Sequence, residues 1–372
     1  MKSAEDLFQY QEIARVLADQ IARGEFDGTG RLPSERVLLE RFNVQRNTVR
    51  RALALLETEG RISIEGKRGS YLKLPGRHEG GRTFLLCVHG GSSPNLARLC
   101  QGFIRASADA GFSVRALDSH PREGAALDSV PDASALDSDV AGVVLWPQNP
   151  TNVEALRRIK NEVPLVLVDR RVIGLSSDCV RFADAEGGRM VAEHLIERGH
   201  RRIAFIADEV FAETVQQRWR GYVMAQESAG IPIDPRLSLF FHGIDNAYVA
   251  LALRYILTLG ADAPTAIMCS NDLVAFHLLR FLHDETVRVP EDLAVTGYGN
   301  MLPDYVSAMA LTSVDQPFYE LGQAAAKILV DRIGHPTSER IQAPREVEIP
   351  VKLIVRGSTS QSPRSVRSSM AG

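Results

Sequence analysis

The sequence predicts an α/β protein in which a small helical domain precedes a larger part built on parallel sheets. Residues 34–72 combine a short helix, a turn, a second helix and a glycine-bearing hairpin. From residue 84 to residue 297, short apolar runs alternate with helical stretches. Such runs are typical of strands buried on both faces of a parallel sheet, and repeated strand–helix units predict open, doubly wound sheets.

The small domain contains two neighbouring predicted helices. Ser34 precedes a run whose apolar residues have helical spacing, so we expect it to be the N-cap. Asn43 and Val44 form the predicted turn, and the second helix runs from residue 46 to residue 59. Away from its apolar stripe, the first turns of this helix carry Arg46, Asn47, Arg50 and Arg51.

Positive charge is concentrated on the second helix and the hairpin. Residues 41–73 hold eight Lys or Arg against three Asp or Glu, whereas residues 1–40 hold five against eight. Two of these cations, Lys67 and Arg68, stand at the turn of the hairpin. A local basic surface on so small a unit is typical of contact with DNA phosphates, and a solvated basic helix beside an ordinary hairpin is the alternative.

Residues 10–72 resemble the winged helix-turn-helix of the GntR family. The resemblance is carried by YQEIARVLADQIARGEF, RLPSERVLLERF, RNTVRRALALLETEG and the hairpin after them. One departure is Lys67, which stands where the family usually has the first glycine of the wing. Arg can read guanine, and Asn adenine, through paired hydrogen bonds. The resemblance implies contact with double-stranded DNA through Arg36, Arg46, Asn47, Thr48, Arg50, Lys67 and Arg68.

Composition places the whole chain among ordinary soluble proteins. Its 372 residues are 45% apolar and 24% charged, which predicts two or three domains, and the net charge of −3 makes the basic surface a local feature. No apolar run reaches the length of a membrane span, and the N-terminus does not have the pattern of a secretory signal. The four scattered cysteines form no CxxC pair. We therefore expect a cytoplasmic protein with reduced thiols and no membrane contact.

The chain beyond the DNA-binding domain, which we place at residues 1–74, has its own organisation. Residues 75–82 are polar and glycine-rich and predict a linker, and residues 83–356 are long enough for two lobes. Residues 357–372 are rich in Ser and Arg and predict a disordered tail. Strands are expected at Phe84–Val88, Val140–Trp146, Leu165–Val168, Arg202–Ala207, Ala266–Cys269 and Leu293–Gly297. Helices are expected at Leu96–Ala110, Gly187–Arg198, Arg218–Ala229, Tyr248–Leu259 and Asp272–Leu282.

Residues 84–359 resemble the effector domain of the LacI/GalR family, a two-lobed relative of periplasmic sugar-binding proteins. The motifs that carry the resemblance are VDRR, DAEGGRMVAEHLIERGHRRIAFI, RWRGY, PTAIMCSNDLVAFHLL, VPEDLAVTGYGN, LTSVDQPFYELGQAA and IVRGST. The resemblance implies a periplasmic-binding-protein-like fold of two doubly wound lobes. It also implies that the chain crosses between the lobes near Phe182, Ser313 and Ala343, and that a small ligand binds in the cleft.

The same resemblance assigns candidate ligand residues. Carboxylate, guanidinium and amide groups together suit sugar hydroxyls, because each hydroxyl both donates and accepts a hydrogen bond. Aromatic side chains that end or follow a strand can stack on a sugar face. The candidates are Asp169, Arg170, Arg218, Asn271, Gln316, Trp146 and Phe182. Gly299 departs from the family, in which many sugar binders have Asp at this position, so a hydroxyl acceptor is missing and Asn300 is its possible substitute.

Enzyme functions lack their motifs. Val88-His89-Gly90-Gly91 after a strand is similar to an esterase oxyanion loop, but the chain has no GxSxG elbow for a nucleophile. It also has no phosphate-binding glycine motif, and the pairs His194/His200 and His277/His283 are six residues apart, which does not suit metal ligands on one helical face. We expect no enzyme, no cofactor and no metal.

Together the two resemblances imply a transcription regulator, similar to regulators of the arabinose-repressor type and expected to repress. We expect a homodimer on a pseudo-palindromic operator, since one winged helix contacts too little DNA for tight specific binding. A sugar-like effector would alter operator affinity, with induction and corepression both open. The alternative is a solute-binding protein of a sugar uptake system, which leaves the basic N-terminal domain unexplained.

Overall fold

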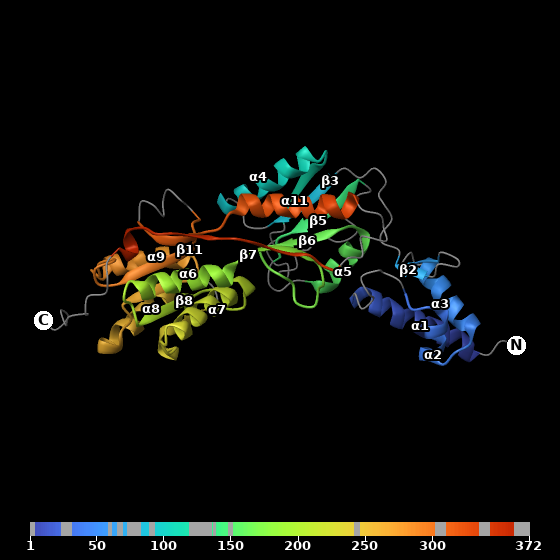
Figure 1. Ribbon diagram of the computed structural model, residues 1–372, viewed down its shortest axis with the longest axis horizontal. Coiled ribbons are helices and arrows are strands. Elements are labelled where there is room, and N and C mark those ends of the chain that lie inside the picture. The colour runs from blue at the N-terminus through green and yellow to red at the C-terminus, as the bar shows by residue number, and fades with distance from the viewer. Residues whose placement is uncertain are drawn as a thin grey trace. The chain divides into compact units, whose positions relative to one another are not determined.

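The computed structural model groups the described residues into an N-terminal helical domain and two α/β sheets (Figure 1). By contacts the chain divides into unit 1 (Met1–Gly91, Leu99–Val180 and Leu321–Val347) and unit 2 (Ser92–Arg98, Arg181–Glu320 and Glu348–Gly372). Crossings were expected near residues 182, 313 and 343. The corresponding divisions between the units lie after Val180, Glu320 and Val347. The structure describes residues 4–23, 32–58, 62–64, 70–72, 83–88, 94–118, 136, 139–147, 152–241, 246–301, 310–334 and 343–360.

The N-terminal domain consists of three helices and a two-stranded hairpin. The elements are α1 (Ala4–Arg23), α2 (Glu35–Phe42), α3 (Arg46–Thr58), β1 (Ile62–Ile64) and β2 (Ser70–Leu72). Ser34 caps α2, as predicted, by accepting a hydrogen bond from the Val37 N–H, and Asn43 ends the helix with φ of 49°. The predicted hairpin is antiparallel, with Ile62 opposite Leu72. Its small core includes Leu17, Leu38, Val49, Leu53, Leu56 and Ile62.

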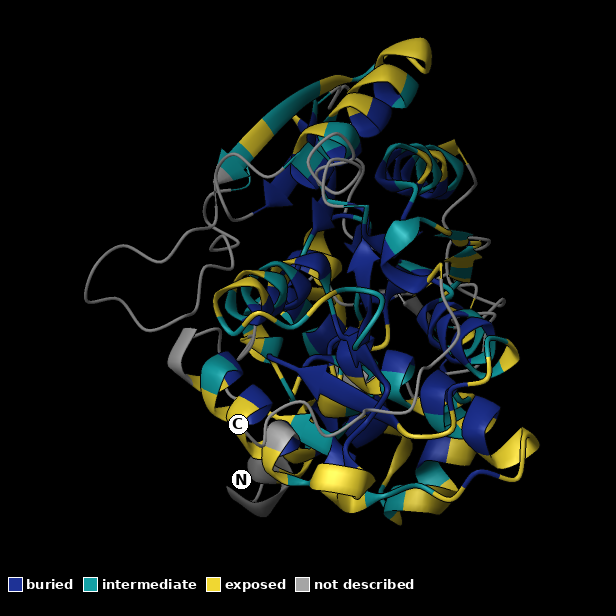
Figure 2. Ribbon diagram, turned by 90° about the vertical axis from the view of Figure 1, so that its left-hand side faces the viewer, coloured by how far each residue is buried: buried dark blue, intermediate teal, exposed yellow. Residues whose placement is uncertain are grey.

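Unit 1 contains a six-stranded sheet in the order β13-β7-β6-β5-β3-β4. Its strands are β3 (Thr83–Val88), β4 (Ser113–Asp118), β5 (Val140–Leu145), β6 (Leu165–Val168), β7 (Asp178–Phe182) and β13 (Glu346–Ile349). Strands β4, β3, β5, β6 and β7 pair in parallel. Strands β3, β5, β6 and β7 are mostly buried and appear dark blue in Figure 2, whereas the edge strand β4 is exposed or half-buried at residues 113–117. Strands β3, β5 and β6 have the burial on both faces that their apolar runs predicted.

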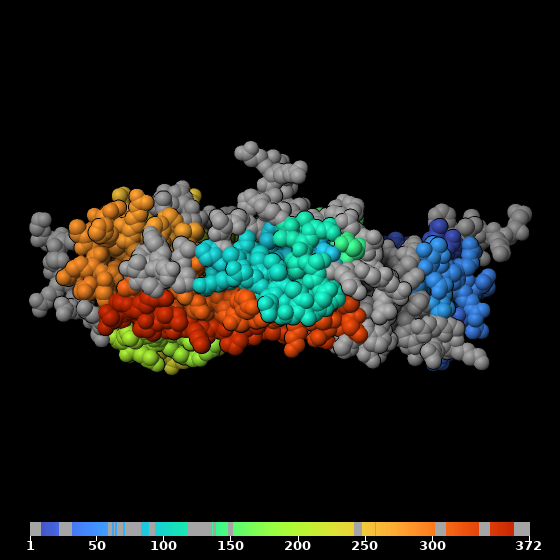
Figure 3. All heavy atoms as spheres, turned by 90° about the horizontal axis from the view of Figure 1, so that it is seen from above, coloured from blue at the N-terminus to red at the C-terminus, as the bar shows by residue number. Residues whose placement is uncertain are grey.

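Helices cover both faces of this sheet. On one face, α5 (Val153–Glu162) buries Leu156 and Ile159 against Leu85 and Cys87 of β3. On the other face lie α4 (Pro94–Asp109) and α11 (Phe318–Gly334), which adjoin in Figure 3. They approach closely, because a Cβ on Gly322 would lie 2.3 Å from the Leu99 carbonyl oxygen.

Unit 2 contains a second six-stranded sheet in the order β14-β12-β11-β10-β8-β9. Its strands are β8 (Ile203–Ala207), β9 (Ser238–Phe240), β10 (Ala266–Cys269), β11 (Ala294–Gly299), β12 (Thr312–Asp315) and β14 (Lys352–Ile354). All neighbours pair in parallel except β14, which is antiparallel to β12. On one face, α8 (Asn246–Thr258) and α9 (Asp272–Asp284) form a large apolar core with the sheet.

The opposite face of the unit 2 sheet carries α6 (Asp184–Glu197) and α7 (Glu213–Ser228), which pack backbone to backbone. A Cβ on Gly188 would lie 2.2 Å from the Arg218 carbonyl oxygen, and one on Gly221 would lie 1.9 Å from the Ala185 carbonyl oxygen. Only glycine leaves room for this approach. Short 3₁₀ turns η3 (Pro235–Leu237) and η4 (Gly260–Asp262) flank β9 and α8.

The predicted elements are present, but several others were missed. The structure adds, beyond the predicted elements, α1, β4, β7, β9, β12, β13, β14, α5 and α11. Strands β7 and β12 were not predicted because they are not apolar runs. Their sequences, DCVRF and TSVD, contain polar residues. The predicted linker, residues 75–82, lies outside the described residues.

The predicted disordered tail is wrong at its start, because Gly357–Thr359 form the 3₁₀ turn η5 and Ser358 and Thr359 are buried. Thr359 Oγ1 lies 2.8 Å from His194 Nε2, and Arg198 Nε donates to the Thr359 carbonyl at 2.7 Å. These polar contacts anchor a segment whose composition alone indicated disorder. Residues 361–372 lie outside the described residues.

We predict that Gly221→Ala destabilises the protein. The added methyl group would overlap the Ala185 carbonyl, and overpacking of this kind costs about 1–3 kcal/mol or more. Thermal unfolding of the full chain measures the effect. Gly334→Ala is the matched control, because nothing lies within 4 Å of its Cβ position and the residue is in a helix. Equal melting temperatures for the two variants would contradict the close packing of α6 and α7.

We also predict that acid weakens unit 2 through two buried histidines. Burial, aided by the charge of Arg198, lowers the pKa of both His194 and His200 from 6.5 to about 4. The unfolded chain therefore binds more protons than the folded one between these values, so this stability is present above pH 6.5 and is lost as pH falls toward 4. Each histidine contributes up to about 3 kcal/mol.

Urea unfolding measured from pH 7.5 down to pH 5 tests this prediction. The variant with both His194→Gln and His200→Gln is expected to show a flatter dependence of unfolding free energy on pH. An unchanged slope in that variant would mean that other groups cause the acid sensitivity.

Candidate functional site

The N-terminal domain presents its predicted DNA-binding residues on α2 and α3. Arg36, Arg46, Asn47 and Arg50 are exposed. Thr48 is only 7% exposed, so its hydroxyl offers little surface to DNA, and this member of the predicted set is not favoured. Lys67 and Arg68 of the wing lie outside the described residues.

The cations on this surface are paired with carboxylates of α2. Arg46 Nε donates to Glu35 Oε2 at 2.9 Å and Arg50 Nε donates to Glu35 Oε1 at 3.0 Å. The hydrogen bonds from Arg46 and Arg50 lower the pKa of Glu35, so this carboxyl is charged. Arg36 lies 3.6 Å from Glu40. The sequence pattern predicts the arginines as DNA contacts, but it gives no indication of the role of Glu35.

In unit 2, polar residues gather where the strand order reverses, between β8 and β10. Asp208 follows β8 and is 5% exposed. Its Oδ1 accepts hydrogen bonds from Ser270 Oγ at 2.9 Å and from Asn271 Nδ2 at 2.7 Å. Asn271, a predicted ligand residue, also caps α9 by accepting the Val274 N–H. Ligands of open α/β sheets bind at such a reversal point, outside the carboxyl ends of the strands.

The predicted ligand residue Arg218 is buried in an ion pair. Its Nε donates to Asp184 Oδ1 at 2.8 Å, and Nη1 donates to the Ser270 carbonyl at 2.8 Å. The guanidinium also lies over the Tyr298 ring, 3.9 Å from its centre. Gln316 Nε2 approaches the same Asp184 oxygen at 3.5 Å. Two of the predicted residues, Arg218 and Gln316, thus meet at one carboxylate that the sequence reasoning missed.

Unit 1 brings together three predicted residues at the carboxyl ends of β5 and β6. Asp169 follows β6, is 5% exposed and has φ of 72°. Its Oδ2 accepts hydrogen bonds from Trp146 Nε1 at 3.1 Å and from Arg170 Nε at 3.2 Å. The carboxylate therefore orients an indole and a guanidinium at the end of the sheet.

Phe182, predicted to stack on a sugar, is fully buried instead. Its ring meets the Phe318 ring edge-on, with 4.8 Å between their centres. The prediction of a stacking surface does not fit this structure, because Phe182 is the last residue of β7 and its apolar ring joins the core.

The backbone at Gly299, the last residue of β11, does not favour the aspartate that many sugar binders have at this position. Gly299 has φ of +114°, and a Cβ there would lie 3.0 Å from Met301 Cγ, so an aspartate would be strained. The loop after β11 is held by Asp272, whose Oδ2 accepts the Met301 N–H at 2.8 Å; burial raises the pKa of this carboxyl. Asn300, the possible substitute, donates from Nδ2 to Asp315 Oδ1 at 2.8 Å and accepts at Oδ1 from Arg356.

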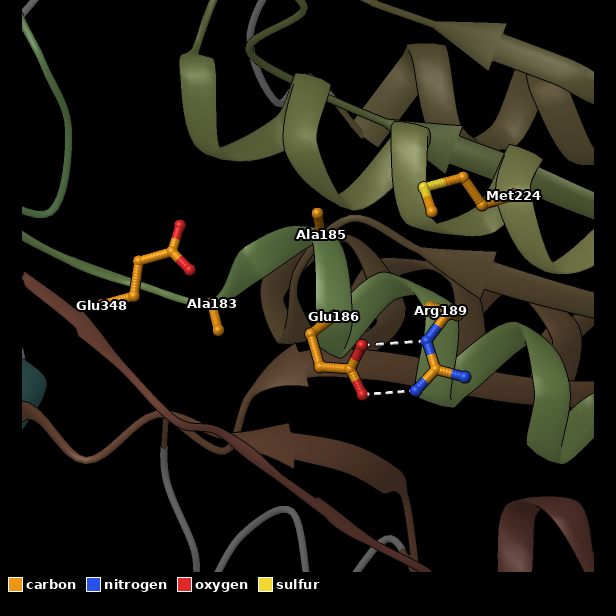
Figure 4. A pocket seen from close by; sticks show the side chains of 6 residues that line it. All are labelled: Ala183, Ala185, Glu186, Arg189, Met224 and Glu348. Carbon is orange, nitrogen blue, oxygen red and sulfur yellow. Dashed lines mark hydrogen bonds and ion pairs between the residues drawn. The ribbon is translucent and has the colours of Figure 1, made fainter.

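A depression of about 250 Å³ lies on unit 2, beside the start of α6 (Figure 4). Its lining includes Ala183, Ala185, Met224 and Glu348, together with Glu186 and Arg189, which pair with each other. It contains none of the predicted ligand residues. Within the part of the chain that the structure describes, no group of three or more His, Cys, Asp or Glu is placed to hold a metal ion. No described helix is long and apolar enough to cross a membrane.

Known proteins are similar to both the N-terminal domain and the α/β part of this chain. Residues 9–72 match the bacterial regulatory proteins of the gntR family, and residues 192–359 match a periplasmic binding protein-like domain. A LacI family regulator from Enterococcus faecium with bound ribose has the same fold, with a TM-score of 0.59 and 25% identity over 76% of this chain and 99% of that one. The regulator CelR in complex with cellobiose gives a TM-score of 0.62 at 25% identity, over 85% of this chain and 91% of that one.

The chain thus joins a GntR-type DNA-binding domain to a LacI-like, periplasmic-binding-protein-like domain, and it is a DNA-binding transcription regulator. It is similar over nearly its whole length to the arabinose metabolism transcriptional repressor of Geobacillus stearothermophilus, with 24% identity over 95% of this chain and 98% of that protein. The repressor PurR of Haemophilus influenzae is 31% identical over 53% of this chain and 57% of its own length. These relatives favour a regulator over the alternative of a solute-binding protein.

We predict that Arg218→Ala destabilises unit 2 by about 3–5 kcal/mol, because it leaves the buried Asp184 charge without its cation. Urea unfolding of the full chain measures the loss. The double variant Asp184→Asn with Arg218→Met removes both charges and is expected to be more stable than Arg218→Ala alone. A double variant at least as unstable as the single one would show that the pair is not what stabilises this site.

Proposed function

We propose that this regulator is a repressor that binds pseudo-palindromic DNA as a homodimer and responds to a sugar-like effector. The observation that carries the proposal is the joining of two features in one chain. One is a recognition helix with exposed arginines, and the other is a set of buried carboxylates at the carboxyl ends of parallel strands.

The described DNA-binding residues of the proposal are exposed on α2 and α3 of the N-terminal domain. Arg46, Asn47 and Arg50 project from the start of α3, and Arg36 projects from α2. Arg and Asn side chains at the start of a recognition helix can pair with guanine and adenine edges in the major groove. Lys67 and Arg68 complete the proposal as wing contacts.

The effector-binding residues of the proposal are Asp169, Arg170 and Trp146 in unit 1 and Arg218, Asn271 and Gln316 in unit 2, with Asp184 and Asp208 added from the structure. Their hydrogen bonds join a carboxylate to an indole, a guanidinium or an amide. Such pre-oriented polar groups suit ligands with many hydroxyls. The structures of relatives with ribose and cellobiose support this class of effector.

Effector and DNA would be coupled through the dimer. A ligand changes operator affinity only as far as it prefers one arrangement of the dimer over another. Coupling of about 1–3 kcal/mol corresponds to roughly 5- to 150-fold in operator affinity. Release of DNA by an inducer is the arrangement we propose.

The experiment compares two variants that separate the two binding functions. Arg50→Ala is expected to weaken binding to a duplex that the full chain enriches from a randomised pool, because a guanidinium at a base edge is worth about 1–3 kcal/mol. It should leave unchanged the thermal stabilisation by whichever neutral sugar a thermal-shift screen identifies. Asp169→Asn is expected to show the converse, since its carboxylate orients Trp146 and Arg170.

Fluorescence anisotropy measures DNA affinity and the thermal shift measures effector binding. Arg50→Ala with the DNA affinity of the unaltered chain would remove α3 as the recognition helix. Asp169→Asn with a full thermal shift would remove the carboxyl ends of the unit 1 strands as the effector site.

A further inference from the structure

Glu35 is a carboxylate that two arginines of the recognition helix share. It is the first residue of α2, whereas Arg46 and Arg50 belong to α3. Glu35 Oε2 accepts a hydrogen bond from Arg46 Nε at 2.9 Å, and Oε1 accepts one from Arg50 Nε at 3.0 Å. One acidic side chain therefore fixes two cations that the proposed function places against DNA.

The need for this carboxylate follows from the spacing of the arginines. Arg46 and Arg50 are four residues apart on one helix, so their guanidinium groups are neighbours and repel each other. Glu35 offsets the repulsion from the adjacent helix. Both arginines are well exposed, with 67% and 56% of their side-chain surface accessible, and exposed ion pairs add little to stability. The consequence of the contacts is therefore the orientation of the two guanidinium groups.

The choice of nitrogen matters for DNA reading. Both arginines use Nε to bond Glu35. Among the described residues, their terminal nitrogens Nη1 and Nη2 have no hydrogen-bond partner in the protein. Terminal guanidinium nitrogens are the donors that pair with O6 and N7 of guanine. The contacts with Glu35 thus leave the reading groups of both arginines available.

We propose that Glu35 is a positioning residue that determines the specificity of DNA reading, by holding Arg46 and Arg50 ready for base edges and away from the nearest phosphates. The inference rests on the proposed function, in which α3 reads DNA. A carboxylate near phosphates repels any DNA, whatever its sequence. Glu35 therefore lowers affinity in general and raises the discrimination between sequences.

The test uses the full-length chain and two fluorescent duplexes. One is the duplex that the chain enriches from a randomised pool, and the other has the same composition in scrambled order. Glu35→Gln offers a single acceptor oxygen and no charge. We expect it to bind the scrambled duplex more tightly and to lower the ratio of the two affinities by about fivefold or more. In a plot of the logarithm of affinity against the logarithm of salt concentration, the slope for the scrambled duplex should be steeper. The slope should change by about 0.9 for each arginine that moves to a phosphate.

Glu12→Gln is the matched control. Glu12 is an exposed carboxylate on α1 that bonds Arg15, so its replacement removes the same charge from the same domain without touching α3. We expect it to leave the affinity ratio unchanged. A ratio lowered equally by both variants would show that only total charge matters, which overturns the proposal.

A double-mutant comparison separates positioning from folding. Arg50→Ala is expected to lower the affinity ratio less in the Glu35→Gln chain than in the unaltered chain, because Arg50 is already out of position there. A merely structural role for Glu35 would leave the effect of Arg50→Ala unchanged, and that result overturns the inference. An unaltered chain that fails to distinguish the two duplexes overturns the proposed function as well. One that distinguishes them while Glu35→Gln keeps its ratio overturns the inference alone.

Discussion

The close approach of α6 and α7 is the constraint on which the chemistry of unit 2 depends. Gly188 and Gly221 let the two backbones meet at distances that any Cβ would prevent. That approach brings Arg218 of α7 to Asp184 at the start of α6. The helix N-terminus favours a carboxylate at this position, and the Tyr298 ring covers the guanidinium. Three groups from different elements thus share one small volume because two residues have no side chain.

Both sheets place their polar groups by the same topological rule. In each, one crossover reverses the strand order, between β3 and β5 in unit 1 and between β8 and β10 in unit 2. The residues after these strands come together because parallel strands end at one edge. Trp146 follows β5, while Asp208 and Ser270 follow β8 and β10. Similar clusters therefore recur in the two units although their sequences differ.

Much of the fold could be predicted from the sequence, because the residues that strands and helices bury are apolar and recur with a regular spacing. Polar strands such as β7 were not predicted, since Asp178 is buried by bonding Arg332, a residue 154 positions away. The prediction of a disordered tail from residue 357 was wrong for a similar reason. Thr359 is buried against His194, and composition does not reveal that contact. Most site residues identified by motif lie close to others of their own unit, but their partners Asp184, Asp208 and Glu35 were missed. Each partner is defined by a tertiary contact, which spacing in a sequence cannot indicate.

Arginines in unit 2 and in the N-terminal domain need different numbers of carboxylate partners, because one is buried and the others are exposed to solvent. Arg218 is buried, so its charge requires a dedicated carboxylate, and removing either partner would leave an unpaired ion in a medium that solvates it poorly. Arg46 and Arg50 are exposed, and water and salt screen their charges. One carboxylate can therefore serve both of them and still leave net positive charge for DNA. A net charge of −3 on the whole chain is compatible with DNA binding for this reason, because the excess is confined to a few exposed side chains.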